Sequence, residues 1–189
     1  MTMATIEIPH PAIPAPAVIY ALGKYRPYWY HRQNGGDGQS FPTHSGRLLD
    51  LKEARESGLS FCLKVLTDEI KATIPLALAA VPSSDAAKLR SGVQQLVTRF
   101  APVIGGLDLG NLLLRTTSIP KLAKGGDRSI GVHLASIAAN DVSRTQGRVV
   151  MLFDDIVTTG NSLAAARQIL LDAGVAEVIC IALGQTSYD

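Results

Sequence analysis

An apolar run that ends in two adjacent acidic residues constrains this chain more than any other feature. Residues 149–162 read Val-Val-Met-Leu-Phe-Asp-Asp-Ile-Val-Thr-Thr-Gly-Asn-Ser. A short run that is apolar on both faces is typical of a central parallel strand covered by helices on each side. Ligands of such sheets bind beyond the carboxyl ends of the strands. We therefore expect Asp154 and Asp155 at a ligand-binding edge, followed by a loop and a helix over residues 163–173.

The residue types at this edge suit a sugar phosphate. Two carboxylates accept hydrogen bonds from ribose hydroxyls or hold a hydrated Mg²⁺. Thr158, Thr159 and Ser162 supply hydroxyl donors. Gly160 lets an anion approach the backbone closely. The amides of residues 159–162 lie at a predicted helix N-terminus, where the dipole favours negative charge. We expect the carboxylates to bind a sugar and the loop to bind a phosphate.

Strand and helix patterns alternate along the remainder of the chain. Further strands are predicted at residues 17–22, 75–81, 111–114 and 177–183, and further helices at residues 59–72, 86–100 and 128–139. Residues 1–16 are rich in Pro and Ala, which predicts an extended arm with little secondary structure. Residues 23–46 are polar, aromatic and Gly-rich, which predicts a loop or hairpin. The alternation implies βαβ units, so the predicted fold is α/β, with a central parallel sheet flanked by helices.

The composition is that of one globular domain. A chain of 189 residues with 47% hydrophobic and 18% charged residues can bury a substantial core. The net charge of +2 does not by itself indicate nucleic-acid binding. Cys62 and Cys180 lie in apolar stretches without metal-binding spacing, which favours buried, reduced thiols. The N-terminus lacks the features of a signal peptide, and no apolar run is long enough to span a bilayer. We therefore expect a cytoplasmic protein without membrane contact.

Residues 149–162 closely resemble the signature with which type I phosphoribosyltransferases bind phosphoribosyl pyrophosphate (PRPP). That signature is an apolar strand, two acidic residues, two variable residues, Thr-Thr-Gly and a small hydroxylic position. The resemblance implies a Rossmann-like single domain, with residues 1–57 as an arm and small hood and residues 58–189 as the core. It also implies a Mg²⁺-dependent, homodimeric enzyme. The alternative is a generic strand–turn–helix with a solvated Asp pair; neither common rival motif, G-x-x-x-x-G-K-[ST] or a strand-linked G-x-G-x-x-G, is present.

In this family the acidic pair contacts the ribose hydroxyls of PRPP, and the following loop holds its 5′-phosphate. Carried onto this chain, the resemblance assigns Asp154 and Asp155 to the ribose and to Mg²⁺, directly or through water. The residues that it assigns to the 5′-phosphate are Thr158, Thr159, Gly160, Asn161 and Ser162.

A second anion site is predicted after the strand at residues 75–81, where Val-Pro-Ser-Ser-Asp precedes a predicted helix. Hydroxyl side chains at a helix N-terminus favour anion binding. The segment resembles the pyrophosphate-binding loop of the family, which implies that Ser83 and Ser84 supply donors. Lys88 and Arg90 add positive charge. The alternative is an ordinary Ser-Asp helix cap.

A third feature is the cationic, Gly-containing segment at residues 115–128. Glycines beside cations predict a loop that closes over a polyanion and excludes water. The family has its flexible catalytic loop at this place, which implies catalytic roles for Lys121, Lys124 and Arg128. The alternatives are a solvated surface loop and, for Arg128, a fixed position at the start of the next helix.

Residues 25–31, Tyr-Arg-Pro-Tyr-Trp-Tyr-His, concentrate aromatic and cationic side chains ahead of a Gly-rich loop. Such a segment can stack on a base or on a partner surface. In the family a variable hood holds the acceptor, and the resemblance places that hood among the residues before about 58. The alternative is packing against the core or across a dimer contact.

The implied function is transfer of the 5-phosphoribosyl group from Mg²⁺-PRPP to a nucleobase-like acceptor, with release of pyrophosphate. Thr158 stands where 6-oxopurine enzymes of the family usually carry a carboxylate. This departure argues against a typical hypoxanthine-guanine enzyme. The Thr-Thr-Gly form resembles the orotate, adenine or competence-protein-F-like branches more closely, although the zinc-binding cysteines usual in the last are absent. The alternative from another class is a non-catalytic PRPP-binding regulator, and the sequence contains no recognisable DNA-binding helix-turn-helix to support it.

Overall fold

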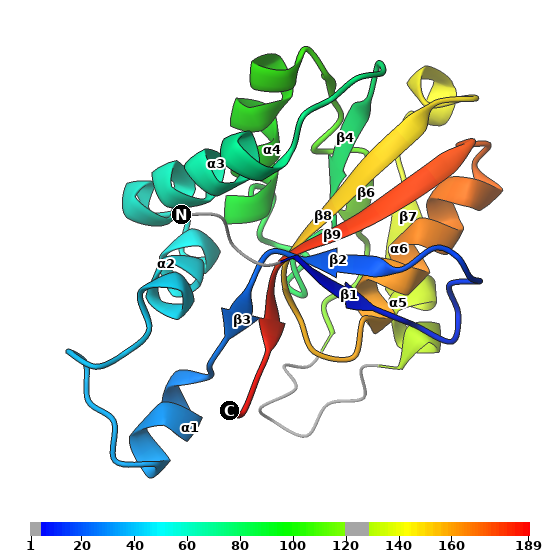
Figure 1. Cartoon of the computed structure of the whole chain (residues 1–189). Coiled ribbons are helices and arrows are strands. Elements are labelled where there is room, and N and C mark those ends of the chain that lie inside the picture. The colour runs from blue at the N-terminus through cyan, green and yellow to red at the C-terminus, as the bar shows by residue number, and fades with distance from the viewer. Residues whose placement is uncertain (1–4, 120–128) are drawn as a thin grey trace.

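The computed structural model describes residues 5–119 and 129–189. Within them, a seven-stranded, mostly parallel sheet forms the centre of an α/β fold (Figure 1). The sheet order is β1 (Ile6–Ile8), β2 (Ile19–Ala21), β9 (Glu177–Thr186), β8 (Val149–Val157), β4 (Ala77–Ala80) and β5 (Leu107–Asp108), and β3 (Lys24–Tyr25) also pairs with β9. The predicted α/β class and its flanking helices are confirmed.

The sheet differs from the prediction at its β1 edge. β1 pairs antiparallel with β2, whereas the other pairings of this sheet in the described residues are parallel. The prediction of an arm with little secondary structure over residues 1–16 is therefore wrong for Ile6–Ile8. Two partly buried isoleucines in this strand pack against the core, which the Pro and Ala content of the segment concealed.

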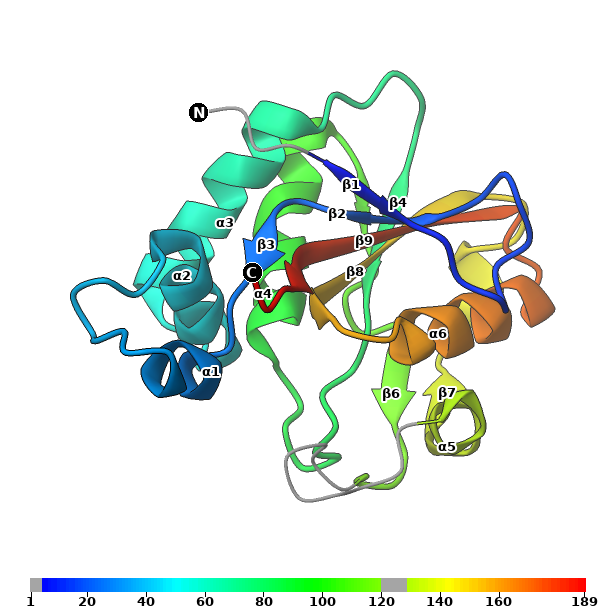
Figure 2. The same cartoon turned by 60° about the horizontal axis from the view of Figure 1, so that its bottom comes forward.

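Helices cover both faces of the sheet (Figures 1 and 2). On one face lie α2 (Thr43–Lys52), α3 (Glu56–Glu69) and α4 (Gly92–Phe100), and on the other lie α5 (Ile130–Ser136) and α6 (Asn161–Asp172). Side chains of β8 alternate between the two cores: Leu152 packs under α6, and Phe153 packs with Phe100 of α4. This two-sided burial explains why the strand is apolar at consecutive positions.

Three predicted elements have different bounds or pairings. The helix predicted at residues 86–100 begins only at Gly92, because Ser91 forms a capping box with Gln94. The helix predicted at residues 128–139 ends at Ser136 and continues as a strand, β7 (Ile137–Ala139). β7 pairs antiparallel with β6 (Leu113–Arg115), so the strand predicted at residues 111–114 belongs to a separate two-stranded sheet.

The region predicted as a loop or hairpin at residues 23–46 contains regular structure. It holds β3, a short helix α1 (Tyr28–Gln33) and the first turn of α2. Pro27 and Pro42 each stand immediately before a helix, where the fixed φ of proline is compatible with helix entry. The Gly-rich stretch is thus confined to the connection between these two helices.

The connections of the sheet change direction between its two central strands. From β4 the chain passes through α4 to β5, whereas from β8 it passes through α6, on the opposite face, to β9. β4 and β8 are direct neighbours, with Ala80 paired to Phe153. The carboxyl ends of two such strands form the crevice in which open α/β sheets bind ligands.

The state of the two cysteines agrees with the prediction from their apolar surroundings. Cys62 and Cys180 are buried and unbonded, and burial raises the pKa of each thiol to about 12. Within the described ranges, no helix is long and apolar enough to cross a membrane.

Close packing of α2 on α4 depends on Gly92. A Cβ at this position would lie 1.7 Å from the Leu51 carbonyl oxygen. Gly92→Ala is therefore expected to lower the free energy of unfolding by about 1–3 kcal/mol, the usual cost of overpacking. Urea denaturation measures the change. Gly38→Ala is the matched control, since its Cβ would meet nothing within 4 Å; equal stability of the two variants would contradict the prediction.

Candidate functional site

A cleft of about 600 Å³ lies at the carboxyl ends of β4 and β8. The residues after β4 (Val81–Ser84) and after β8 (Thr158–Gly160) line it, together with the acidic pair of β8. The N-terminus of α4, the C-terminus of α2 and residues of β3 and α1 complete its wall. Among residues 5–119 and 129–189, the predicted ribose, phosphate and pyrophosphate residues thus meet at one cavity, except Asn161 and Arg90, which do not line it.

The two carboxylates of the acidic pair face opposite sides of the sheet. Asp154 and Asp155 are successive residues within β8, which continues to Val157 and does not end before them as the sequence suggested. On the α6 face, Ser162 Oγ donates to Asp154 Oδ2 over 2.9 Å. On the α2 face, Lys52 Nζ lies 3.7 Å from Asp155 Oδ2. Both carboxylates nevertheless line the cleft, because the strand reaches its edge here.

Asp154 resists ionisation. Burial, followed by the negative charge of Asp155, raises the pKa of Asp154 to about 7, although the hydrogen bond from Ser162 opposes the shift. A cation in the cleft that both carboxylates line would lower the penalty for charging both. The pair therefore carries electrostatic strain of the kind that a bound metal ion or a cationic group relieves.

The loop after β8 and the start of α6 line the cleft with Thr158, Thr159, Gly160 and Ser162. Gly160 adopts φ +85°, a left-handed conformation that favours glycine, and it stands directly before the first residue of α6. No described side chain caps this helix end with a good hydrogen bond; the contact from the Asn161 amide to Thr159 Oγ1 is 3.5 Å long. Amides at such an end attract an anion, as the sequence predicted.

The hydroxyl groups of this loop differ in orientation. Thr158 Oγ1 lies 2.7 Å from Thr186 Oγ1 of β9, and Ser162 is bonded to Asp154. The Asn161 side chain accepts a hydrogen bond from His10 in the N-terminal arm, and Asn161 does not line the cleft. Its predicted contribution to phosphate binding is therefore limited to its backbone.

The loop after β4 is built differently from the prediction. Ser83 and Ser84 line the cleft, but they do not precede a helix, because α4 begins only at Gly92. The helix-N-terminus argument for this loop is wrong. Its conformation is instead held by Arg115, whose Nε donates to the Ser83 carbonyl over 3.0 Å, and by Ile119, whose amide donates to the Ser84 carbonyl over 2.9 Å.

Arg115 is a functional candidate that the sequence reasoning did not single out. It lies at the end of β6, lines the cleft and is only 8% exposed. Its guanidinium also donates to Ser136 Oγ over 2.6 Å. A cation that directly follows the apolar run Leu112–Leu114 was the available signal. A buried guanidinium beneath a hydroxyl-rich loop supplies positive charge where an anion would bind.

Two lysines add further positive charge to the cleft. Lys52 ends α2 beside Asp155, and Lys88 donates from the loop after β4 to the Lys52 carbonyl over 2.7 Å. Lys88 was predicted to add charge. Lys52 was missed because its helix was not predicted.

An aromatic wall flanks the cleft on the side of β3 and α1. It consists of Tyr25, Trp29 and Tyr188, of which Trp29 and Tyr188 are 56% and 50% exposed. The Trp29 and Tyr188 ring centroids lie 6.1 Å apart, and Tyr30 Oη donates to the Tyr188 carbonyl over 2.5 Å. Large exposed aromatic surface beside a polar cleft is suited to a planar ligand. Tyr188, near the C-terminus, was not anticipated.

The three predicted catalytic cations, Lys121, Lys124 and Arg128, lie outside the described residues. The described residues on either side of this segment border the site. Ile119 is anchored to the loop after β4, and α5, which begins after the segment, places the buried His133 at the cleft.

The donor set fits a magnesium ion that is shared with a ligand. In residues 5–119 and 129–189, no group of three or more His, Cys, Asp or Glu side chains is arranged to hold a metal. Mg²⁺ commonly uses one or two carboxylates and takes its remaining ligands from water and substrate phosphates. Asp154 and Asp155, with their mutual repulsion, match that pattern.

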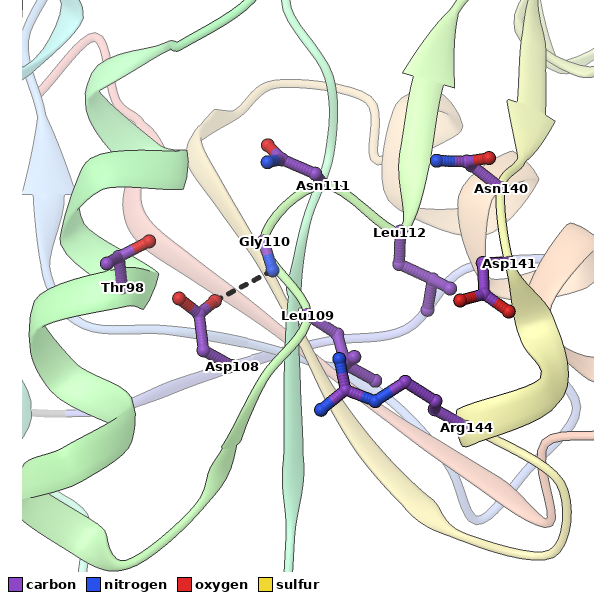
Figure 3. A pocket seen from close by; sticks show the side chains of 9 residues that line it. All are labelled: Thr98, Asp108, Leu109, Gly110, Asn111, Leu112, Asn140, Asp141 and Arg144. Atoms are coloured by element: carbon purple, nitrogen blue, oxygen red, sulfur yellow. Dashed lines mark hydrogen bonds between the residues drawn. The ribbon is translucent and has the colours of Figure 1, made fainter.

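A second cavity of about 230 Å³ lies at the outer edge of the sheet (Figure 3). The residues around it include Asp108 of β5, Asn111 in the following turn, Asn140 and Asp141 after β7, and Arg144 of η3 (Val142–Arg144). Asp108 Oδ1 accepts a hydrogen bond from the Gly110 amide over 2.9 Å. The two cavities share no lining residue, and the predicted site residues that line a cavity line the larger one.

No known family model matches this chain, and no curated protein sequence matches it. The fold is that of an α/β protein with a cleft at the switch point of its mostly parallel sheet.

The raised pKa of Asp154 predicts a pH-dependent stability. Between the ordinary pKa of 3.8 and about 7, the folded protein holds a proton that the unfolded chain has released, so the free energy of unfolding falls as the pH rises through this window. Asp154→Asn should remove this decrease, because the amide is neutral throughout. Urea denaturation of both proteins at about pH 5 and about pH 8 tests the prediction. Parallel losses of stability in the two proteins would contradict it.

Proposed function

We propose that this protein is a phosphoribosyltransferase of type I that binds Mg²⁺-PRPP and transfers its 5-phosphoribosyl group to a nucleobase-like acceptor. The observation that carries the proposal is the meeting of three features at one cleft. These are the Asp154–Asp155 pair, the amide-presenting loop before α6, and the Ser83–Ser84 loop backed by Arg115. A ribose that carries a phosphate at one end and a pyrophosphate at the other needs these three chemistries together.

In the proposed complex, the loop at Thr158–Ser162 binds the 5′-phosphate and the acidic pair binds the ribose hydroxyls. The Ser83–Ser84 loop binds the pyrophosphate, with positive charge from Arg115, Lys88 and the predicted cations Lys121, Lys124 and Arg128. Mg²⁺, held by Asp154 and Asp155 and by ligand oxygens, would neutralise charge that develops on the leaving group. The homodimer and the cytoplasmic location implied by the resemblance belong to the same proposal.

The proposed reaction exchanges two bonds at C1′. A nitrogen of the acceptor forms a bond to C1′, and the bond from C1′ to the pyrophosphate oxygen breaks with its electron pair on the pyrophosphate. The proton of the acceptor nitrogen passes to the pyrophosphate or to water. Because the transition state resembles an oxocarbenium ion, the residues contribute mainly by positioning the reactants and by stabilising the departing charge.

The acceptor would enter along the aromatic wall. Trp29 and Tyr188 expose ring surface to the cleft, and β3 and α1, which carry Tyr25 and Trp29, lie within the predicted hood. Thr158 is bonded to Thr186 and offers no carboxylate to a purine, which favours an acceptor other than a 6-oxopurine.

Replacing both carboxylates should abolish binding of Mg²⁺-PRPP. Asp154→Asn with Asp155→Asn removes the negative charge that holds the cation, while both side chains keep their size. Calorimetric titration measures binding, and a pyrophosphate-release assay with a panel of nucleobases measures turnover. The control is Asp141→Asn with Asp172→Asn, which changes the net charge equally at exposed positions outside the cleft.

Unchanged affinity in the doubly substituted cleft variant would refute the proposed site. If the wild-type protein binds Mg²⁺-PRPP but releases no pyrophosphate with any base, transfer activity is refuted and a PRPP-binding regulator replaces it.

Arg115→Lys should weaken pyrophosphate binding selectively. Lysine keeps the charge but cannot reproduce the guanidinium contacts to the loop and to Ser136, so the dissociation constant of pyrophosphate should rise by about tenfold. Arg144→Lys, in the second cavity, is the matched control. A dissociation constant that is unchanged in Arg115→Lys would exclude this role.

A further inference from the structure

The connection between β1 and β2 contacts the loop at Thr158–Ser162, to which the proposed function assigns the 5′-phosphate. The connection lies on the same side of the sheet as α6 in both views (Figures 1 and 2), and its contact with Asn161 places it at the start of that helix. From this connection His10, only 7% exposed, places Nε2 3.1 Å from Oδ1 of Asn161. Ile13, three residues further on, is buried in the core and fixes the connection to the domain.

The hydrogen bonds of His10 identify its tautomer. The backbone amide of Ala12 donates to Nδ1 over 3.1 Å, and a backbone N–H can only donate. Nδ1 therefore carries a lone pair, and the proton of the neutral ring is on Nε2. His10 consequently donates to the carbonyl oxygen of the Asn161 side chain. The hydrogen bond from the Ala12 amide thus fixes the orientation of the His10 ring that contacts Asn161.

The same ring packs against Gly160. A Cβ on Gly160 would lie 2.9 Å from His10 Cδ2 and 2.7 Å from Ile19 Cδ1, so the arm and β2 close the space behind the loop. Gly160 and Ser162 line the cleft, whereas Asn161 between them does not, because its side chain is turned toward the arm. The side chain of Asn161, the first residue of α6, is thus held away from the cleft.

We propose that His10 is a positioning residue for the anion-binding loop. As the Nε2–H tautomer it holds Asn161, and through Asn161 it keeps the amides of Gly160–Ser162 directed into the cleft. This inference rests on the proposed function, in which these amides bind the 5′-phosphate of PRPP. It adds that the connection between β1 and β2 contributes to phosphate affinity.

Two ligands that occupy different parts of the cleft separate positioning from general stability. Ribose 5-phosphate uses the loop that His10 contacts, and pyrophosphate uses the Ser83–Ser84 loop, which His10 does not contact. His10→Phe keeps a ring against Gly160 but removes both hydrogen bonds. Its dissociation constant for ribose 5-phosphate should rise about fivefold to tenfold, the effect of one hydrogen bond, with pyrophosphate affinity unchanged.

His10→Gln retains an N–H donor of similar reach and should restore ribose 5-phosphate affinity to within about twofold of wild type. Asn161→Ala removes the acceptor while His10 stays in place, and it should reproduce the selective loss even if His10→Phe fails to fold. The double variant should be no worse than Asn161→Ala, as expected for two residues that act through one contact.

Calorimetric titration of each variant with each ligand distinguishes the possible failures. The proposal for His10 is overturned if wild type binds ribose 5-phosphate and the His10 and Asn161 variants bind it equally well. It is also overturned if they lose both ligands alike, since that pattern indicates a structural role only. If wild type binds neither ribose 5-phosphate nor PRPP, the proposed function itself is wrong and the role of His10 falls with it.

Discussion

The pairing of β4 with β8 is the constraint on which the site depends. These strands are hydrogen-bonded neighbours, and the pairing continues past β4, where the Val81 amide donates to the Phe153 carbonyl over 2.8 Å. Because the chain leaves β4 toward one face and β8 toward the other, their following loops separate and open a cleft between them. The same pairing brings the Ser83–Ser84 loop, the acidic pair and the start of α6, which are far apart in the sequence, to one place.

The electrostatics of the cleft follow from this geometry. Successive residues of a strand face opposite sides, so Asp154 receives a hydrogen bond from α6 and Asp155 is balanced by Lys52 of α2. The two carboxylates remain close enough for the charge of one to raise the pKa of the other. Around them stand Arg115, Lys52 and Lys88, and the N-terminus of α6, which no side chain in the described part of the chain caps; all of these favour anions. A site with two repelling carboxylates among several cationic groups suits a polyanion that arrives with a divalent metal ion.

The sequence predicted the elements whose signals are local. The β8 strand and the α6 helix follow from residues 149–173 alone, since their apolar pattern and the small loop residues between them are contiguous. Two of the failures have different origins. Residues 137–139 continue a helical pattern, but a non-local pairing with Leu113–Arg115 makes them a strand. The helix predicted from residue 86 begins only at Gly92, because the local capping box between Ser91 and Gln94 fixes its start. Lys52 and His10 become candidates only when folding brings them to Asp155 and Asn161, which are far away in the sequence. For Arg115 the local signal was its position directly after an apolar run, but its contact with the Ser83–Ser84 loop is non-local.

A crystal structure of the protein with PRPP and Mg²⁺ would test the central claim most directly. The account predicts the 5′-phosphate within hydrogen-bond distance of the Gly160–Ser162 amides, the ribose hydroxyls at Asp154 and Asp155, and the pyrophosphate between the Ser83–Ser84 loop and Arg115. Binding of PRPP in the reverse orientation, binding in the second cavity, or an empty cleft at saturating PRPP would contradict it.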